Sequence, residues 1–258
     1  NSATSHHFYT AANNTTTGGT ERIRVLSNGH VAIGHDIAND TGMFKVIAAD
    51  GQSDDQYVGQ FKNLEATTNR NWGVLIQAGS SSTDESFRVR NSANNADHLK
   101  IRGDGVVTKP QQPSFHAYGN NSWTQYTGSN NTVKLLNALV NIGSHYKTSG
   151  SDEGKFVCPV AGTYFFYFLI YSGRTDNSQT DNNNYLSINL ISSSGSLANN
   201  GGHHIAHYYN EADRDSSRSL SFIKTCTAGE KIYVQVNCNG AGYQIYGGHS
   251  GFGGYLLG

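Results

Sequence analysis

Five consecutive aromatic residues, Tyr164 to Phe168, constrain the fold of this chain more than any other feature. Successive side chains of a β-strand point to opposite faces, so Tyr164, Phe166 and Phe168 share one face while Phe165 and Tyr167 share the other. A strand with large aromatic side chains on both faces must be covered on both sides. We therefore expect one face to fill a hydrophobic core and the other to meet a neighbouring subunit.

Short strand-like runs recur along the whole chain, separated by Gly, Asn and Ser, and no long apolar stripe of helical period is found. Charged residues make up 14% and aromatic residues 11% of the 258 residues, a composition typical of β architectures with many tight turns. The expected fold class is all-β. Strands are expected at 43–48, 72–78, 86–90, 114–118, 154–158, 162–171, 185–191, 217–225, 231–236 and 251–257.

Charge and hydropathy exclude two classes of partner. The net charge of −1 offers no basic face for nucleic acid. The longest apolar run, Tyr164 to Tyr171, has the length of a strand and is far shorter than the ~20 residues that span a bilayer, so no membrane insertion is expected. The first residue is Asn1 rather than Met, which suggests a fragment of a longer chain.

The three cysteines, Cys158, Cys226 and Cys238, have no zinc-site spacing. One disulfide with one free thiol and three buried free thiols are both open, and the second is preferred because free cysteine is commonly buried.

A hairpin pattern occurs twice in the first 107 residues. The run 21–34 alternates apolar and polar residues around Asn28-Gly29, a dipeptide that favours a type I′ hairpin turn with positive φ at both positions. The run 97–107 repeats the pattern with Asp104-Gly105 in that place, so the two runs form an imperfect internal repeat.

The first of these runs resembles the short hairpins of phage tail-fibre and bacterial surface-fibre shafts. That resemblance covers 20–36 well and 97–107 loosely, and it implies that three chains wrap around one axis. Isolated hairpins are marginal in water, and a trimer would bury their apolar side chains against symmetry mates. These side chains are Ile23, Val25, Val31 and Ile33.

Two of the three prolines lie in the stretch 109–113, which we expect to be a stiff extended linker. Residues 1–108 are then a β-rich fibre shaft, and residues 114–258 form a separate head of ordinary domain size.

Five motifs of the head, in order, resemble those of the C1q-like family, which shares its jelly roll with tumour-necrosis-factor-like ligands. The segment Gly154 to Phe168 is similar to that family's G-x-F-x-C-P-V-x-G-x-Y-x-F-x-F core. The resemblance implies a ten-stranded jelly roll, assembly as a homotrimer and, in the region 210–215, a calcium site of oxygen ligands. The other four motifs lie at 113–117, 137–146, 228–236 and 250–257, and the candidate calcium ligands are Asn210, Glu211, Asp213 and Asp215.

No catalytic motif is recognised, and we expect the protein not to be an enzyme. Exposed Tyr and Trp beside adaptable amides suit the recognition of a glycan or a protein. Turn chemistry alone also explains Asn- and Gly-rich loops. The candidate receptor-binding residues, all expected in loops, are Tyr118, Trp123, His203, His204, His207, Tyr208, Tyr209, Tyr243 and Tyr246.

Together these features favour a trimeric phage tail fibre on the virion surface, whose head binds a host-surface glycan or protein. The alternative is a secreted, extracellular C1q-like lectin or recognition protein. A surface-glycan depolymerase is a third hypothesis, for which Glu211 with Asp213 or Asp215 is the available carboxylate pair. Apart from the calcium option, no cofactor is expected.

Overall fold

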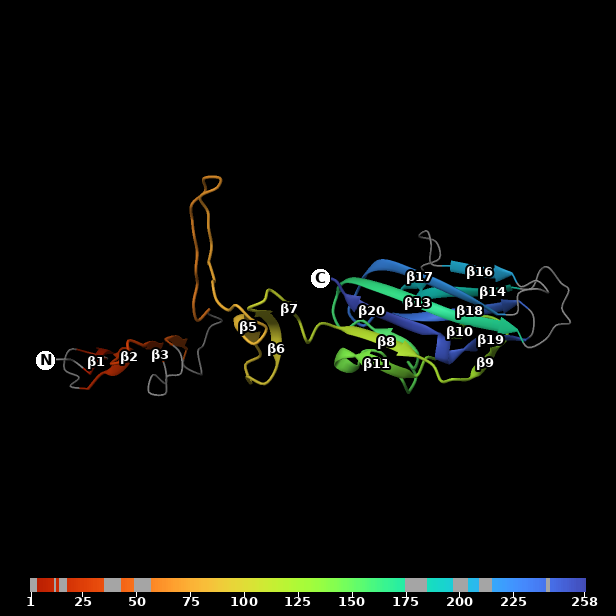
Figure 1. The fold of residues 1–258 in the computed structure, drawn as a ribbon, viewed down its shortest axis with the longest axis horizontal. Helices are drawn as coiled ribbons and strands as arrows, with labels where there is room; N and C mark the ends of the chain where they lie inside the picture. Colours follow the sequence, from red (N-terminus) through yellow and green to blue (C-terminus); the bar gives the residue numbers. More distant parts are fainter. Residues whose placement is uncertain are drawn as a thin grey trace. The chain divides into compact units, whose positions relative to one another are not determined.

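The computed structural model of the protein describes residues 4–11, 13, 18–34, 43–48, 57–174, 185–196, 204–208, 215–239 and 242–258. Within them the regular structure is β-strand, apart from two short 3₁₀ turns, η1 (Ile142–Ser144) and η3 (Gly247–His249), which confirms the all-β class (Figure 1). The chain divides into two compact units, Asn1–Ile76 and Gln77–Gly258. No helix in the described part has the length and apolar character needed to cross a membrane.

The first unit contains one four-stranded sheet that has almost no core of its own. Strands β1 (Ser5–Thr10), β2 (Thr20–Leu26) and β3 (Val31–Gly34) pair antiparallel, and β4 (Phe44–Ile47) joins β3 in parallel. Ala32 is the one fully buried apolar side chain of the sheet's described residues. Phe8, Tyr9 and Phe44 are 56%, 57% and 63% exposed, so this single chain leaves large apolar side chains in water.

The two repeats form the same hairpin turn, but not the type I′ turn predicted from Asn28-Gly29. In the first copy the Leu26 N–H bonds the His30 carbonyl and the Gly29 N–H bonds the Leu26 carbonyl, so the loop has three residues. Gly29 has a φ of 84°, whereas Asn28 does not have a positive φ, which is the pattern of a turn followed by a G1 bulge. The Asn28 side chain instead accepts the His30 N–H at 3.1 Å.

The second copy reproduces each of these contacts between β6 (Asp97–Arg102) and β7 (Val107–Thr108). Arg102 and Val106 make the closing bond, Gly105 has a φ of 87°, and Asp104 accepts the Val106 N–H at 3.3 Å. The internal repeat seen in the sequence is therefore a repeat of structure.

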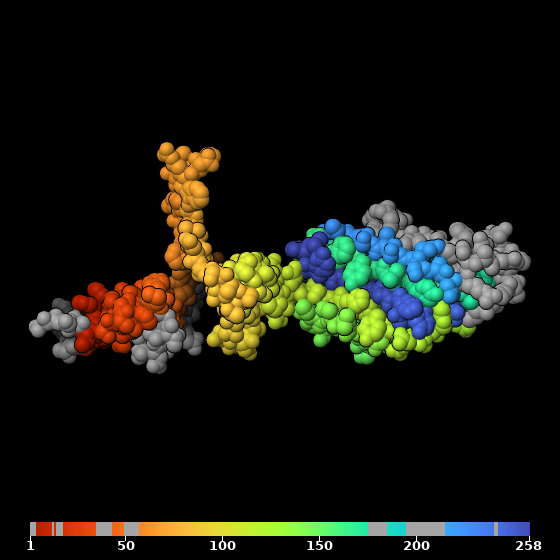
Figure 2. All heavy atoms as spheres, in the orientation of Figure 1, coloured from red at the N-terminus to blue at the C-terminus, as the bar shows by residue number. Residues whose placement is uncertain are grey.

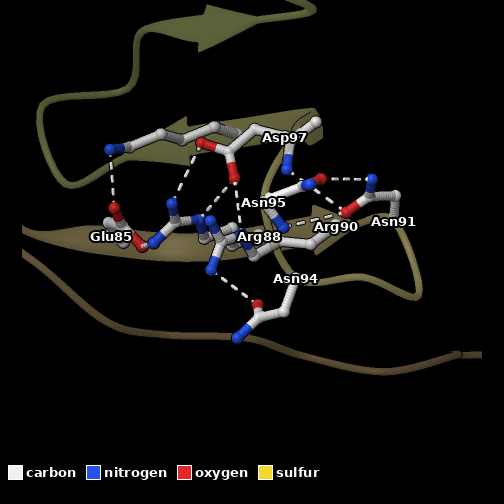
Figure 3. A network of polar contacts seen from close by, with 9 residues as sticks. Glu85, Arg88, Arg90, Asn91, Asn94, Asn95 and Asp97 are labelled. Carbon is white, nitrogen blue, oxygen red and sulfur yellow. Dashed lines mark hydrogen bonds and ion pairs between the residues drawn. The ribbon is translucent and has the colours of Figure 1, made fainter.

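Ion pairs between side chains link the strands of the sheet that contains this second copy. Strand β5 (Glu85–Arg90) pairs with β6, and Figure 3 shows Asp97 between Arg88 and Arg90, with Nε–Oδ1 distances of 2.7 and 3.1 Å. Glu85 bonds Arg88 at 3.1 Å. Phe87 and Val89 are each 38% exposed, so this small sheet also lacks a sufficient core.

The head is a sandwich of two antiparallel sheets. The larger has the order β11-β8-β20-β13-β19-β9, with β17 also pairing β13; the smaller has the order β10-β18-β14-β15, with β12 on β18 and β16 on β14. The ten-strand count stays a prediction, since several of the head's loop residues lie outside the described ranges. The strands are β8 (Ser114–Tyr118), β9 (Trp123–Tyr126), β10 (Asn131–Thr132), β11 (Asn137–Asn141), β12 (Lys155–Val157), β13 (Gly162–Arg174), β14 (Tyr185–Ser192), β15 (Gly195–Ser196), β16 (His204–Tyr208), β17 (Asp215–Cys226), β18 (Lys231–Asn239), β19 (Tyr243–Tyr246) and β20 (Gly251–Leu256).

The aromatic strand predicted from the sequence is β13, and its alternation decides where the core lies. Tyr164, Phe166 and Phe168 are at most 1% exposed and pack between the two sheets. Phe166 lies 5.9 Å from Phe156 and 6.4 Å from Phe252 between ring centroids. Strand β20 lies between β8 and β13, so the last strand is central in the sheet, as the sequence predicted.

A buried carboxylate, Glu230, fixes the turn before β18. It is 5% exposed and accepts hydrogen bonds from Ser192, from Ser194 at 2.8 Å and from the Thr227 N–H at 2.9 Å, and it pairs with Lys224 at 3.0 Å. Burial raises the pKa of Glu230, but these hydrogen bonds together outweigh it and lower the pKa to about 2.

All three cysteines are free and buried, which confirms the preferred prediction. A hydrogen bond with Cys226, together with burial, raises the pKa of the Cys158 thiol. Burial also raises the pKa of Cys238, to about 11.

Three other sequence predictions are wrong. The segment 72–78 forms no strand, because it finds no partner strand among the described residues. Several candidate residues expected in loops lie on strands instead: His204, His207 and Tyr208 are on β16, which pairs with β14, and Tyr243 and Tyr246 are on β19, which pairs with β13. The linker is not extended: the Gln112 N–H bonds the Lys109 carbonyl at 2.9 Å, which gives a turn with Pro110 at its second position.

Candidate recognition surface

The outer face of the larger sheet is lined by apolar and aromatic side chains. On β13, Phe165, Tyr167, Leu169 and Tyr171 alternate with the buried residues and point away from the core. Neighbouring strands add to the same face: Ile223 on β17 and Tyr255 on β20 are both register partners of Phe165. We call these residues, with His116 on β8, the outer aromatic face. Leu169, Ile223 and Tyr255 are 43%, 63% and 45% exposed.

A glycine allows Tyr167 to lie across this face. The Tyr167 hydroxyl bonds His116 Nδ1 at 2.6 Å, and the ring passes over Gly253 of β20. A Cβ at position 253 would lie 2.4 Å from the Tyr167 hydroxyl oxygen, so a side chain there would displace the ring. The centre of the face therefore contains a polar pair surrounded by apolar side chains.

The ends of the head's chain lie at one end of this face. The Leu256 N–H bonds the Pro113 carbonyl at 3.0 Å and the Thr163 N–H bonds the Gly258 carbonyl at 2.9 Å, so the start and the end of the head meet beside Gly162. We call this the proximal end, and the opposite end of β13, beyond Tyr171, the distal end.

Four rings form a cluster at the distal end: Trp123, Tyr171, Tyr246 and His249. Ring centroids lie 5.5 Å apart for Trp123 and Tyr171, 5.2 Å for Trp123 and Tyr246, and 4.8 Å for Tyr246 and His249. Trp123 is 38% exposed and His249 is exposed. We call this group the distal aromatic cluster.

Hydrogen bonds hold the distal aromatic cluster in place. Ser250, 3% exposed, donates to the Tyr246 carbonyl at 2.8 Å and accepts the Tyr171 N–H at 3.0 Å, which joins η3 to β13. The Tyr171 hydroxyl donates to Asp215 at 3.0 Å, a bond that raises the pKa of Tyr171. The cluster thus offers aromatic faces, an imidazole and a carboxylate in a preformed arrangement.

A hollow of about 570 Å³ lies beside β9. Its lining includes the amides of Asn120, Gln125, Asn130 and Asn131. Lys134 also lines it but is paired with Glu153, so the hollow is nearly neutral and combines polar with apolar surface. Such a lining can hydrogen-bond hydroxyl groups without attracting a charged ligand.

The structure brings together two of the predicted receptor-binding residues, Trp123 and Tyr246, which face each other as register partners of β9 and β19. Tyr118 ends β8 and is 40% exposed. The prediction for Tyr243 is wrong: it is fully buried, because β19 turns this position into the core, where it lies 5.2 Å from the Arg174 guanidinium.

The other predicted residues are only partly placed. His204, His207 and Tyr208 lie on β16, whereas His203 and Tyr209 lie outside the described residues. Of the four candidate calcium ligands, only Asp215 is described. Among the described side chains there is no group of three or more His, Cys, Asp or Glu positioned to hold a metal, and the calcium site stays a prediction.

Sequence reasoning did not select Tyr171 and His249. Tyr171 could have been found from the alternation of faces along a strand. It lies an even number of residues, six, after Phe165 and therefore points to the same side. His249 had no such signal, since its place depends on the 3₁₀ turn η3.

The residues of this jelly-roll head match the sequence pattern of a known domain family. Residues 114–257 match the sequence profile of the C1q domain. The chain belongs to the C1q domain family. A mouse relative, complement C1q tumor necrosis factor-related protein 2, is 30% identical over 128 residues, which are 48% of this chain and 37% of the mouse protein. The chain therefore spans well under two thirds of that relative's length.

Two solved structures are similar to the C1q domain. The globular domain of zebrafish complement 1qA is 18% identical, with a TM-score of 0.42, over 57% of this chain and 98% of that chain. Eiger TNF from S. frugiperda is 15% identical, also with a TM-score of 0.42, over 57% of this chain and 94% of that chain.

Proposed function

We propose that the protein is a non-enzymatic, homotrimeric recognition protein whose C1q domain binds a glycan or protein on a cell surface. One observation carries the proposal: the outer aromatic face of the larger sheet has large apolar side chains that its own chain leaves partly in water. Monomeric soluble proteins rarely leave a contiguous apolar face of this kind uncovered.

Three copies around one axis would cover this face on every subunit without any other protein. A closed cyclic assembly covers the same patch on every subunit and leaves no patch open for further growth. We assign the proximal and central parts of the face, Phe165, Leu169, Ile223 and Tyr255, to the contact between subunits. The polar pair of Tyr167 and His116 is already satisfied within one chain, so its burial would cost little.

We assign ligand binding to the distal aromatic cluster and the neighbouring hollow. Aromatic faces provide large, rigid contact area, and amides provide adaptable hydrogen bonds, which is the combination found in many binding surfaces. The near-neutral hollow favours an uncharged ligand rich in hydroxyl groups, such as a glycan.

For the whole chain we propose a phage tail fibre at the virion surface, with 1–108 as shaft, 109–113 as linker and 114–258 as head. The two hairpins, which share one turn geometry, support this proposal, because each has too few apolar residues to fold alone. The second candidate is a secreted recognition protein, which is favoured by the likeness of the head to a mouse C1q-related protein.

The subunit contact is tested by substituting the most exposed aliphatic residue of the face. We expect light scattering to give the mass of three chains for the wild type and of one chain for Ile223→Asp, since a charge cannot be buried there unpaired. The control Ser151→Asp, at an exposed turn of the head, should keep three chains. A wild-type mass of one chain at micromolar concentration contradicts the proposal.

Ligand binding is tested with a glycan array probed by the full chain. We expect binding to fall at least tenfold in Trp123→Ala, with the circular dichroism spectrum and the subunit mass unchanged. Retained binding in this variant would remove the distal aromatic cluster from the site.

A further inference from the structure

Residues 57–76 form an arm in which the exposed large apolar side chains are denser than elsewhere in the described part of the chain. Figure 1 shows it in orange as two extended limbs joined by a tight turn, and Figure 2 shows its bare surface. All eight of its large apolar side chains are at least half exposed. They are Tyr57 at 86%, Val58 at 56%, Phe61 at 82%, Leu64 at 77%, Trp72 at 80%, Val74 at 63%, Leu75 at 87% and Ile76 at 50%.

The tip of the arm is well defined by hydrogen bonds. The Arg70 N–H bonds the Thr67 carbonyl at 3.1 Å, and Asn69 has a φ of 67°. The Asn63 side-chain amide donates to the Trp72 carbonyl at 2.9 Å, which places the two limbs side by side. The indole N–H of Trp72 donates to the Asn69 carbonyl at 3.2 Å.

The two limbs, unlike the tip, are not held by hydrogen bonds between backbone groups of the described residues. Residues 57–62 and 73–76 make no backbone–backbone hydrogen bond to any described residue. Two extended segments with free N–H and C=O groups are templates for pairing with further strands. Among the described residues, the two limbs of the arm therefore have no backbone partner, and their large side chains are uncovered.

The exposed apolar area of the arm is comparable to the area that one protein buries in a specific complex. An aromatic side chain presents about 150–250 Å², so the three aromatic residues of the arm expose roughly 500 Å² by themselves. The largest apolar patch of a typical monomer is about 300–600 Å² in total. The five aliphatic residues bring the arm close to the ~800 Å² that each partner buries in a specific complex.

The pattern of the limbs indicates what covers them. Val74, Leu75 and Ile76 are consecutive, so both faces of the second limb are apolar. A segment added to the edge of another protein's sheet usually keeps one face in water, whereas strands covered on both faces carry continuous apolar runs. The arm has only three charged residues, Lys62, Glu65 and Arg70, so several copies can approach one another without strong repulsion.

We infer that the arm is an interchain element, in which the limbs of three copies of this chain cover one another. The inference rests on the proposed homotrimer, in which three identical arms are always present together and run in the same direction. Each arm then supplies the unpaired backbone and the apolar faces that the other two require. No second protein is needed to cover the arm.

Tryptophan fluorescence tests the inference, because the chain has only two tryptophans. Trp123→Phe leaves Trp72 as the sole probe, and the matched variant Trp72→Phe leaves Trp123. We expect the Trp72 emission to be shifted to the blue in the folded protein, with an acrylamide quenching constant at least threefold lower than in urea. Equal quenching in the folded and unfolded protein overturns the inference.

Subunit mass, measured on the same samples, separates the possible failures. A mass of three chains with accessible Trp72 keeps the trimer and overturns the arm contact. A mass of one chain with accessible Trp72 overturns both. A mass of one chain with shielded Trp72 also overturns the inference, because the arm is then covered by its own chain.

A pyrene label on Leu75→Cys identifies what shields the arm in a trimer. The three native cysteines are buried, so the label goes to the new thiol. We expect excimer emission, which requires two labels in contact, and none from the control Ser151→Cys. A trimer whose labelled arm gives no excimer overturns the inference.

Discussion

Replacing Glu230 by glutamine should remove a pH-dependent part of the stability of the C1q domain. The folded pKa of this carboxyl is about 2, against an ordinary value of 4.5. The difference, at about 1.36 kcal/mol per pH unit, corresponds to about 3 kcal/mol of stability. Glu230 is 5% exposed, so solvent screens its hydrogen bonds little.

The sign follows from the lowered pKa. The carboxylate is favoured in the folded state, so its contribution is complete above about pH 4.5 and is lost as the pH falls towards 2. By pH 3 about 1.4 kcal/mol of it remains. Glu230→Gln should therefore cost about 3 kcal/mol at pH 7 and less than half of that at pH 3.

The assay is urea unfolding followed by circular dichroism at several pH values, with the protein concentration held fixed because an oligomer's stability depends on it. Glu153→Gln is the control, since Glu153 is a more exposed carboxylate whose ion pair with Lys134 lies at the surface. Its cost should stay under about 1 kcal/mol. A cost of Glu230→Gln that is equal at pH 7 and pH 3, or equal to that of the control, would refute the reasoning.

Three further predictions concern the same domain. Gly253→Val should lower the free energy of unfolding by about 1–3 kcal/mol in urea titrations, because it displaces the Tyr167 ring, whereas Gly258→Val, at an uncrowded position, should change it little. None of the three native thiols should react quickly with a thiol reagent at pH 7, and all should react in urea; one fast thiol in the folded protein contradicts their burial. Removal of calcium with EDTA should lower the melting temperature if residues 210–215 hold the ion, and an unchanged temperature removes that site.

The parts of the fold that the sequence predicts are those set by local alternation. The parity of Tyr164 to Phe168 gives the core face of β13 directly, and the glycine of Asn28-Gly29 marks the hairpin, although not its turn type. What fails depends on pairing across the chain. Tyr243 reads as a loop tyrosine because Asn and Gly precede it, yet pairing with β13 and β9 makes it a strand residue and buries it.

The candidate site is harder to predict for the same reason. Trp123, Tyr171 and Tyr246 are separated by dozens of residues and meet only because β9 and β13 both pair with β19. The prediction for segment 72–78 is wrong in the opposite direction, because a strand was predicted and none is found. Its residues favour a strand, but no described residue of the same chain pairs with it. A strand preference without an intrachain partner is what a segment that pairs between chains would show.

The length of β13 links the two roles that we assign to one face. The strand begins at Gly162, beside Pro113 and Gly258, and reaches Tyr171 after about 30 Å at about 3.3 Å per residue. In the proposed trimer, side chains that point outward from this one strand would make a subunit contact near the chain ends, while others form the distal aromatic cluster far from them. Because one strand, paired with β17 from Gly162 to Gly173, joins both regions, trimer contacts along its proximal half would fix three distal clusters at equal distances from one axis. Multivalent binding then requires no further ordering of the site, and a ligand with repeated units could engage more than one cluster at once.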